Sequence, residues 1–131
     1  LISILLYKGD KIEAEKLSGI KIESDKDLEK AAEFFLKKGC KRVFITLGPE
    51  GVYYNDGNSK GFVEGKKVKV VNATGAGDAF VAGLVYGHLN EMNIKDTAVF
   101  AQGAGILALL HESTINPSMS LENVNKIIEG V

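Results

Sequence analysis

Residues 68–80, VKVVNATGAGDAF, constrain the fold of this chain more than any other stretch. The first residues form a β-type run, a turn with two glycines follows, and a helix of small residues is predicted to begin near Gly77. A strand that turns sharply into a helix aims several backbone N–H groups, together with the positive end of the helix dipole, at one point. Such a point binds anions, and phosphate is the usual occupant.

Asp78 lies at the mouth of this predicted phosphate site, where its charge would repel the phosphate. One explanation is catalytic: the carboxylate is a general base that takes a proton from a hydroxyl group attacking phosphorus. The other explanation is structural, because an acidic residue in the first turn of a helix interacts favourably with the helix dipole. The stretch by itself leaves both explanations open.

Length and composition favour a single globular domain over residues 1–131, with an apolar share of 45% and a charged share of 25%. The net charge of −1 gives no electrostatic reason to expect nucleic acid as a partner. We expect no membrane partner either, because the longest mostly apolar run, 98–110, is shorter than the ~20 residues that span a bilayer. The single cysteine, Cys40, excludes an internal disulfide framework and fits the reducing cytoplasm.

Hydrophobic periodicity and turn residues define the expected elements. Helices are expected over 11–17, between the N-cap Ser24 and the stop Gly39, and over 77–89, 95–110 and 120–130. Strands are expected over 1–7, 42–47, 52–54, 60–63 and 67–71, with residues 8–10 breaking the first strand and 55–58 carrying a hairpin signal.

This alternation of strands and helices predicts an α/β layered domain with a mainly parallel sheet and a hairpin insert. Ligands of such sheets bind at the carboxyl ends of the strands. The glycine turns 48–51 and 75–77 both follow strands, so both should lie at that edge. One face of the 95–110 helix carries only small residues and could approach a neighbouring backbone closely: Ala101, Ala104, Gly105 and Ala108.

The commoner phosphate-binding templates do not fit the glycine turn. A P-loop requires a lysine after its second glycine, and none follows Gly77 at that spacing. A dinucleotide fingerprint requires a third small residue, whereas Phe80 is too large for close packing of the helix on the strand.

Four segments instead resemble, in the expected order, the ribokinase-like (PfkB-type) carbohydrate and nucleoside kinases. Residues 74–80, TGAGDAF, are similar to the D-T-x-G-A-G-D signature of that family, and residues 8–15, KGDKIEAE, to its K-P-N-x-x-E-A-E stretch. Residues 46–51, TLGPEG, resemble its T-x-G-x-x-G turn. Residues 100–117 resemble the terminal helix and loop beside the nucleotide. The resemblance covers nearly the whole chain.

The resemblance implies a ribokinase-like fold, of which this chain would be the C-terminal, nucleotide-binding half, without the sugar-binding part and the lid. It implies transfer of a phosphoryl group from ATP to a small sugar or nucleoside, with Mg²⁺ as a cofactor, K⁺ as an optional one, and a homodimer as a candidate assembly. The chain by itself is then expected to be inactive.

The resemblance also implies a role for individual residues. Asp78 would be the catalytic base, and the N–H groups of Ala76, Gly77 and Asp78 would bind the transferring phosphoryl group. Glu13 would organise Mg²⁺ through water, and Asn72 and Thr74 could contribute to a monovalent-cation site. The remaining nucleotide contacts would come from Thr46, Gly48, Gly51, Thr74, Gly75, Gln102 and Asn116.

Two departures from the family pattern bear on these roles. Asn72 stands where an aspartate is usual, which puts K⁺ dependence in doubt. Gly9 and Asp10 replace Pro-Asn, and the Asp10 carboxylate would either bind the metal more directly or repel the triphosphate.

Within the family, residues 72–78, 100–103 and 114–117 are most similar to members that phosphorylate the 5′-hydroxyl of pseudouridine. Ribose, fructose or adenosine is the alternative acceptor. A non-catalytic nucleotide-binding module is the alternative from another class, favoured by the substitutions at Asp10 and Asn72.

Overall fold

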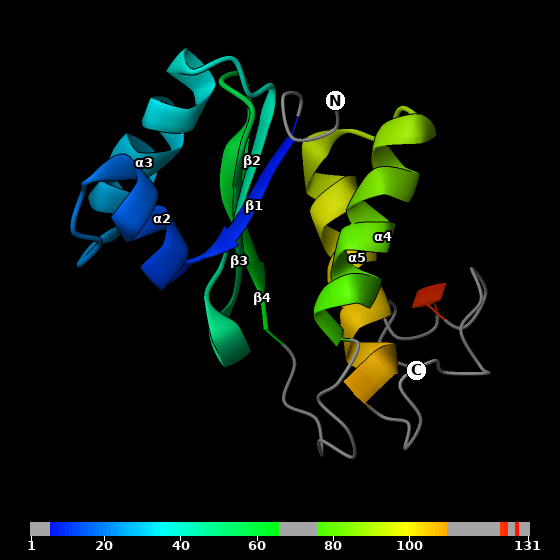
Figure 1. Ribbon diagram of the computed structural model, residues 1–131. Helices are drawn as coiled ribbons and strands as arrows, with labels where there is room; N and C mark the ends of the chain where they lie inside the picture. The colour runs from blue at the N-terminus through cyan, green and yellow to red at the C-terminus, as the bar shows by residue number, and fades with distance from the viewer. Residues whose placement is uncertain (1–5, 66–75, 110–123, 126–127, 129–131) are drawn as a thin grey trace. The chain divides into compact units, whose positions relative to one another are not determined.

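The computed structural model describes residues 6–65, 76–109, 124–125 and 128. They belong to two compact units, Leu1–Gly65 and Lys66–Val131, and each unit is described by itself (Figure 1). The first unit contains a sheet with helices, and the described part of the second is helical.

The first unit is built on a four-stranded sheet in the order β1-β2-β3-β4, formed by Leu6–Asp10, Arg42–Thr46, Gly51–Asn55 and Lys60–Glu64. The crossover between β1 and β2 makes them parallel, whereas the β2–β3 and β3–β4 pairs are antiparallel. The α/β class is therefore confirmed, but the expectation of a mainly parallel sheet is wrong for these strands. The reason is the length of the connections: residues 47–50 and 56–59 are far shorter than the dozen or so residues that a parallel crossover needs.

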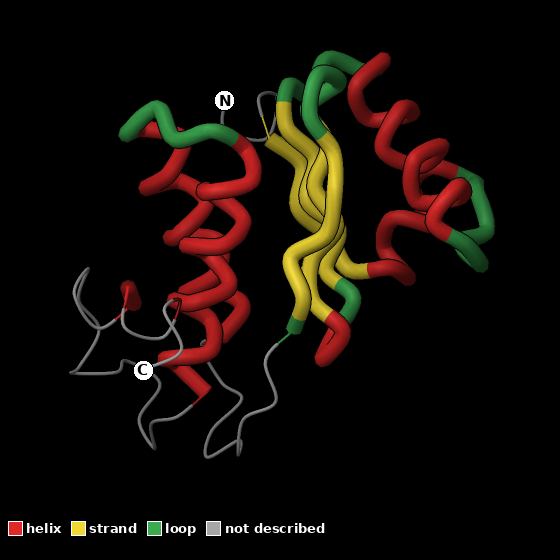
Figure 2. The backbone as a smooth tube through the Cα atoms, turned by 180° about the vertical axis from the view of Figure 1, so that it is seen from behind, coloured by secondary structure: helices red, strands yellow, loops and turns green. Residues whose placement is uncertain are grey.

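Helices α2 (Lys11–Ser18) and α3 (Asp25–Lys37) lie on the same face of this sheet (Figures 1 and 2). Their apolar side chains form one core with side chains of that face: Ala14, Leu28, Ala31, Ala32, Phe35, Val43, Ile45 and Tyr53. Because successive side chains of a strand point to opposite faces, Lys8, Phe44 and Thr46 lie on the other face.

The ends of α2 and α3 follow the sequence signals in all but one place. Ser24 caps α3 through a hydrogen bond from the Asp27 N–H to its hydroxyl oxygen (3.3 Å), and Gly39 follows the helix with a φ of 108°. The expectation that residues 8–10 break the first strand is wrong. Strand β1 continues to Asp10 and α2 begins at the next residue, because Asp10 serves both as the last strand residue and as the helix cap.

The second unit contains helices α4 (Ala76–Leu89) and α5 (Ile94–Leu109), which run antiparallel and side by side (Figures 1 and 2). A Cβ atom built on Gly83 would lie 2.6 Å from the Ala101 Cα, and one built on Gly87 would lie 2.7 Å from the Thr97 Cγ2. Gly83 and Gly87 therefore allow the two helix backbones to approach closely.

The small residues predicted to share one face of α5 contact two different neighbours. Ala101 and Gly105 face α4, since a Cβ on Gly105 would lie 3.7 Å from the Phe80 Cβ. Ala104 instead belongs to an apolar cluster that includes Val124. The side chain of Ala108 lies outside the described residues.

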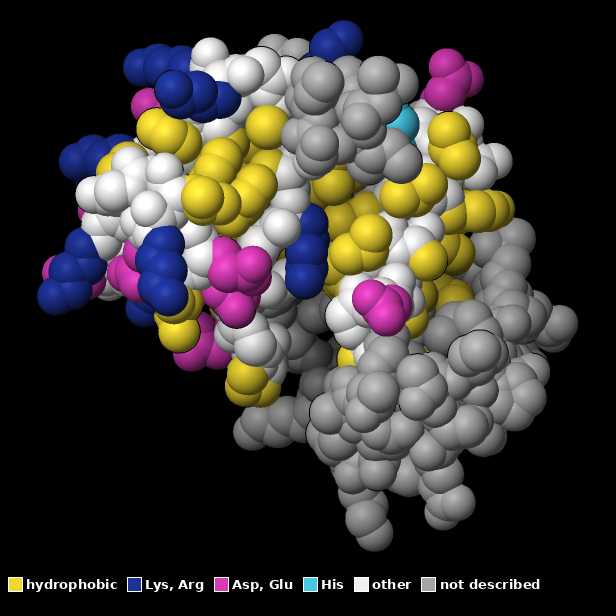
Figure 3. All heavy atoms as spheres, viewed as in Figure 1, with side chains coloured by type: hydrophobic (Ala, Val, Ile, Leu, Met, Phe, Trp, Pro, Cys, Tyr) yellow, Lys and Arg dark blue, Asp and Glu magenta, His cyan; other side chains and the backbone are white. Residues whose placement is uncertain are grey.

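Helix α4 differs from α3 in being apolar on more than one side. It exposes Val81, Tyr86 and Leu89, and hydrophobic side chains gather over the α4–α5 pair in Figure 3. The predicted strand at 67–71, most of the predicted strand at 1–7 and most of the predicted helix at 120–130 lie outside the described residues. In the part of the chain that is described, no helix combines the length and apolarity needed to cross a bilayer.

Candidate functional site

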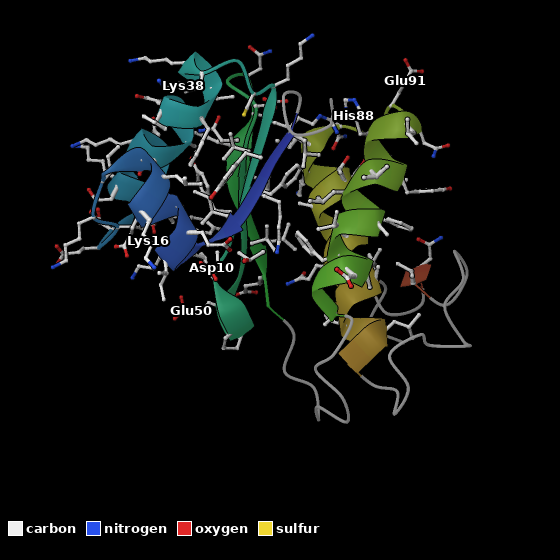
Figure 4. The ribbon with its side chains drawn as sticks, viewed as in Figure 1. Asp10, Lys16, Lys38, Glu50, His88 and Glu91 are labelled. Atoms are coloured by element: carbon white, nitrogen blue, oxygen red, sulfur yellow. The ribbon has the colours of Figure 1, made fainter. Side chains whose placement is uncertain are left out.

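The carboxyl ends of β1 and β2 meet at one edge of the sheet. Asp10 is paired with Thr46 in the parallel register, and the Thr46 hydroxyl donates a hydrogen bond to the Gly9 carbonyl oxygen (3.5 Å). The η1 turn (Gly48–Glu50) follows β2 directly, and Figure 4 shows Asp10 and Glu50 at the same end of the sheet. The prediction that the 48–51 turn lies at the carboxyl edge is thus confirmed.

The two glycines of this turn serve different purposes. Gly51 has a φ of 123°, and a Cβ there would collide with the Val63 carbonyl oxygen and lie 2.7 Å from the Gly65 nitrogen. Gly51 is therefore required by the packing of the strands. Gly48 has a φ of 61° and is exposed, and a Cβ there would meet no described atom within 4 Å.

Helix α2 begins at this edge with a reciprocal pair of hydrogen bonds. The Glu13 N–H donates to Asp10 Oδ1 (2.8 Å), and the Asp10 N–H donates to Glu13 Oε1 (3.0 Å). This arrangement is a capping box, which satisfies two N–H groups at the start of a helix. The Asp-x-x-Glu spacing at 10–13 was the available sequence signal, and sequence reasoning missed it. It gives Asp10 a structural task and holds the exposed Glu13 carboxylate beside the end of β1.

Tyr7 explains why a glycine follows at position 9. The Tyr7 ring stacks on Phe35 with 3.8 Å between ring centroids, and a Cβ at Gly9 would collide with the Tyr7 hydroxyl. The space that the expected proline would need is thus occupied by Tyr7. The Tyr7 hydroxyl is buried with no hydrogen-bond partner in the described ranges, and its burial, followed by the charges of Glu13 and Asp10, raises the pKa of Tyr7 to about 12.

The second unit presents the start of α4. Ala76 is half-buried, whereas Gly77 and Asp78 are exposed in the first turn. A Cβ built on Gly77 would meet no atom of a described residue within 4 Å. The Asp78 carboxylate makes no hydrogen bond or ion pair with any residue that the structure describes. Among the described residues, the first turn of α4 thus combines open space next to its backbone with a carboxylate that has no partner.

The other predicted site residues divide between described and undescribed positions. Gln102 is half-buried in α5. Asn72, Thr74, Gly75 and Asn116 lie outside the described residues. Neither the single cysteine nor His88 joins a metal cluster, since no group of three or more His, Cys, Asp or Glu side chains suited to a metal ion occurs among the described residues.

The donor chemistry at the α2 end fits Mg²⁺ in a nucleotide site. Such an ion is usually held by one or two carboxylates, with phosphate and water oxygens as the remaining ligands. The Glu13 carboxylate is exposed and uses Oε1 to accept the Asp10 N–H, so Oε2 is available to a metal-bound water.

Comparison with known proteins gives a consistent match. The family model described as pfkB family carbohydrate kinase matches residues 4–121. Pseudouridine kinase from Escherichia coli (strain K12) is 39% identical over 131 residues, which cover 99% of this chain and 42% of that protein. Ribokinase from Staphylococcus aureus (strain COL) is 34% identical over 129 residues, which cover 97% of this chain and 41% of that protein. The chain thus spans about two fifths of the length of these relatives.

Solved structures share the fold. A sugar kinase candidate from Clostridium perfringens has a TM-score of 0.90 at 45% identity, over 95% of this chain and 40% of that one. Phosphofructokinase-2 from Escherichia coli, in complex with potassium, has a TM-score of 0.85 at 26% identity, over 98% of this chain and 42% of that one. A ribokinase II candidate from Escherichia coli, in complex with ATP and Mg²⁺, has a TM-score of 0.81 at 25% identity, over 96% of this chain and 39% of that one.

Proposed function

Because the chain belongs to the pfkB family of carbohydrate kinases, we propose that the protein transfers a phosphoryl group from ATP to a hydroxyl group of a sugar or nucleoside. The preferred acceptor is the 5′-hydroxyl of pseudouridine, since a pseudouridine kinase is 39% identical over nearly the whole chain. Ribose, fructose and adenosine are the alternative acceptors, and a ribokinase is among the relatives. The proposed setting is the cytoplasm, and the proposed assembly is a homodimer.

The observation that carries this proposal is the open space at Gly77. Glycine in a helix interior costs about 1 kcal/mol relative to alanine, and in the first turn, where Gly77 lies, it is still less favourable than alanine, so each glycine of α4 needs a reason. Gly83 and Gly87 have one, because they lie against α5, but no described atom lies within 4 Å of a Cβ on Gly77. A ligand that approaches the α4 backbone supplies the missing reason, and the N-terminus of a helix favours an anion such as a phosphoryl group.

Residues in the first turn of α4 would then carry out phosphoryl transfer. Asp78 takes the proton of the acceptor hydroxyl, and the oxygen of that hydroxyl forms a bond to the γ-phosphorus. At the same time the bond from the γ-phosphorus to the β–γ bridging oxygen breaks, which releases ADP. The N–H groups of Ala76, Gly77 and Asp78 stabilise the charge that spreads over the phosphoryl oxygens. Asp78 is exposed and has no partner among the described residues, which supports access of a hydroxyl donor to its oxygens.

The first unit would supply nucleotide and metal contacts. Bound Mg²⁺ neutralises charge on the nucleotide phosphates. Glu13 is proposed to hold a water ligand of that ion, with Asp10 fixing the orientation of the Glu13 carboxylate. Thr46, Gly48 and Gly51 are proposed to line the phosphate and ribose side.

Further contacts are proposed for residues of the second unit on the strength of the family pattern. Thr74 and Gly75 would contact phosphate, and Gln102 and Asn116 would contact adenine. Asn72 and Thr74 remain candidates for a monovalent-cation site, which the potassium complex of phosphofructokinase-2 makes worth testing.

A substrate panel tests the proposed function. The complete product of the gene that encodes this chain is incubated with ATP, Mg²⁺ and pseudouridine, ribose, fructose or adenosine, and ADP release and the phosphorylated product are measured. We expect pseudouridine 5′-phosphate to form fastest. ATP binding without transfer to any acceptor would contradict the kinase proposal and favour a non-catalytic nucleotide-binding module.

The variant Asp78→Asn tests the role of the proposed base. It keeps the size of the side chain but removes the proton acceptor, so kcat should fall by about 100-fold or more, the usual contribution of a general base. The dissociation constant of ATP, measured by calorimetry, should be nearly unchanged. Retained turnover in this variant would show that Asp78 is not the base.

A further inference from the structure

Lys8 occupies an unusual position for a lysine. It is the central residue of β1, it is half-buried, and it is paired in the register with Phe44, which is fully buried. It shares its face of the sheet with Leu6, a buried residue two positions before it. Lysine is rarely buried without a partner, because an ammonium group loses its hydration there.

No described residue compensates the charge of Lys8. Lys8 takes part in neither the Lys21–Glu23 nor the Lys60–Glu29 ion pair, and its ammonium makes no hydrogen bond with a described residue. The nearest carboxylates in the sequence are Asp10 and Glu13, and each accepts a backbone N–H of the other residue in the α2 capping box. Lys8 is therefore half-buried in the sheet without a counter-ion among the described residues.

The carboxyl edge of the sheet is within reach of a lysine side chain at position 8. Lys8 precedes Asp10 by two residues, so the two Cα atoms are separated by about 7 Å at the usual rise of a strand. A lysine lays its four-carbon stem along apolar surface and keeps its charged end at the polar rim. On this face the polar rim is formed by Asp10 and Thr46, which are paired at the ends of β1 and β2.

A positive charge would reduce the electrostatic repulsion at this edge once a nucleotide is bound. Asp10 and Glu13 each carry a negative charge, and a nucleotide triphosphate would add several more. An ammonium group binds phosphate oxygens as a compact point charge with three donors. We propose that Lys8 is a phosphate-binding residue, whose ammonium contacts the phosphate oxygens of the bound nucleotide; this inference rests on the proposed kinase function.

The test compares nucleotide binding by Lys8→Met and by its matched control, Lys11→Met, in the complete gene product. Both variants remove one positive charge, but Lys11 is exposed at the start of α2. For Lys8→Met we expect ATP and ADP to bind about tenfold more weakly or worse, the loss typical of one charge-assisted hydrogen bond. Adenosine, which has no phosphate, should bind with unchanged affinity, and Lys11→Met should change ATP affinity by less than about twofold, as expected of a screened surface charge.

Two further readouts separate phosphate binding from a structural role. The melting temperature of Lys8→Met should be equal to or higher than that of the wild type, because methionine places an apolar group of similar length on an apolar face. Lys8→Arg keeps the charge and should retain most of the ATP affinity. Should Lys8→Met fail to fold, Lys8→Gln provides the same comparison with a polar, neutral side chain.

Unchanged ATP affinity in Lys8→Met, or an equal loss of ATP and adenosine binding with a lower melting temperature, would overturn the inference. These outcomes are distinct from failure of the proposed function. A wild-type protein that binds ATP but transfers no phosphoryl group defeats the kinase proposal while leaving the binding comparison intact. A wild-type protein that does not bind ATP overturns both.

Discussion

The two helix N-termini that carry the proposed catalytic groups differ in how their first N–H groups are satisfied. In α2, Asp10 and Glu13 close the end with reciprocal hydrogen bonds of 2.8 and 3.0 Å. In α4, the preceding residue is Gly75, which has no side chain to act as a cap, and no described atom lies within 4 Å of a Cβ on Gly77 in the first turn. The chain thus uses its own carboxylates to satisfy the α2 end, whereas no described side chain caps the first turn of α4.

The same contrast appears among the glycines of α4 itself. Gly83 and Gly87 are required because α5 lies against them, with Ala101 and Thr97 at the points of contact. Gly77 has no such neighbour among the described residues. A helical glycine that packing explains and one that it does not explain can therefore be compared within one element, which makes the comparison open to experiment.

The largest effect on stability is expected for Gly83→Ala. The added methyl group would lie 2.6 Å from the Ala101 Cα, so the helices must separate, at a cost of about 2 kcal/mol in the free energy of unfolding. Urea denaturation of the variant and the wild type measures this cost. An unchanged unfolding midpoint would show that the helices can separate without penalty and would remove the packing half of the comparison.

A smaller effect is expected for Asp10→Ala. Loss of an N-cap side chain typically costs about 1 kcal/mol, and the Glu13 N–H would lose its acceptor. Asp10→Asn is the matched control, because asparagine caps helices about as well as aspartate, so the stability of this variant should stay within a few tenths of a kcal/mol of the wild type. If alanine and asparagine proved equally neutral, the α2 end would not depend on its capping box, and the contrast with α4 would weaken.

Local signals in the sequence were sufficient for most of the elements. Ser24 marked the start of α3 because a serine oxygen can accept an N–H of the first turn, and Gly39 marked its end because glycine adopts a positive φ without strain. The hairpin between β3 and β4 was indicated by the Asn-Asp-Gly-Asn run. These signals act over a few residues, so a single sequence contains them in full.

Features that depend on distant residues were harder to predict. The glycine at position 9 is explained by the Tyr7 hydroxyl, whose placement depends on stacking against Phe35 of α3. The task of Asp10 was missed for a different reason: the acidic pair 10 and 13 was interpreted as metal chemistry, and its capping spacing was overlooked. Both cases show that a departure from a family pattern can have a local structural cause.

The position of the 46–51 turn at the sheet edge was predictable because its residues are contiguous, whereas the roles of the site residues stay predictions. Thr46, Gly48 and Gly51 follow one strand, and the structure places them at the carboxyl edge as expected. The sequence could not show whether packing requires Gly77, because that depends on the neighbours of each glycine of α4 in the folded structure.

The most direct test of the account is therefore the variant Gly77→Ala, with stability and ATP-dependent phosphoryl transfer measured on the same preparation. The account predicts that the free energy of unfolding is unchanged or rises by up to about 1 kcal/mol, because alanine favours the helix and meets no neighbour among the described residues. It predicts that kcat/KM falls by about tenfold or more, because the methyl group enters the space proposed for the phosphoryl oxygens. Full activity in a stably folded Gly77→Ala protein would contradict the claim that the α4 end is kept open for a phosphoryl group.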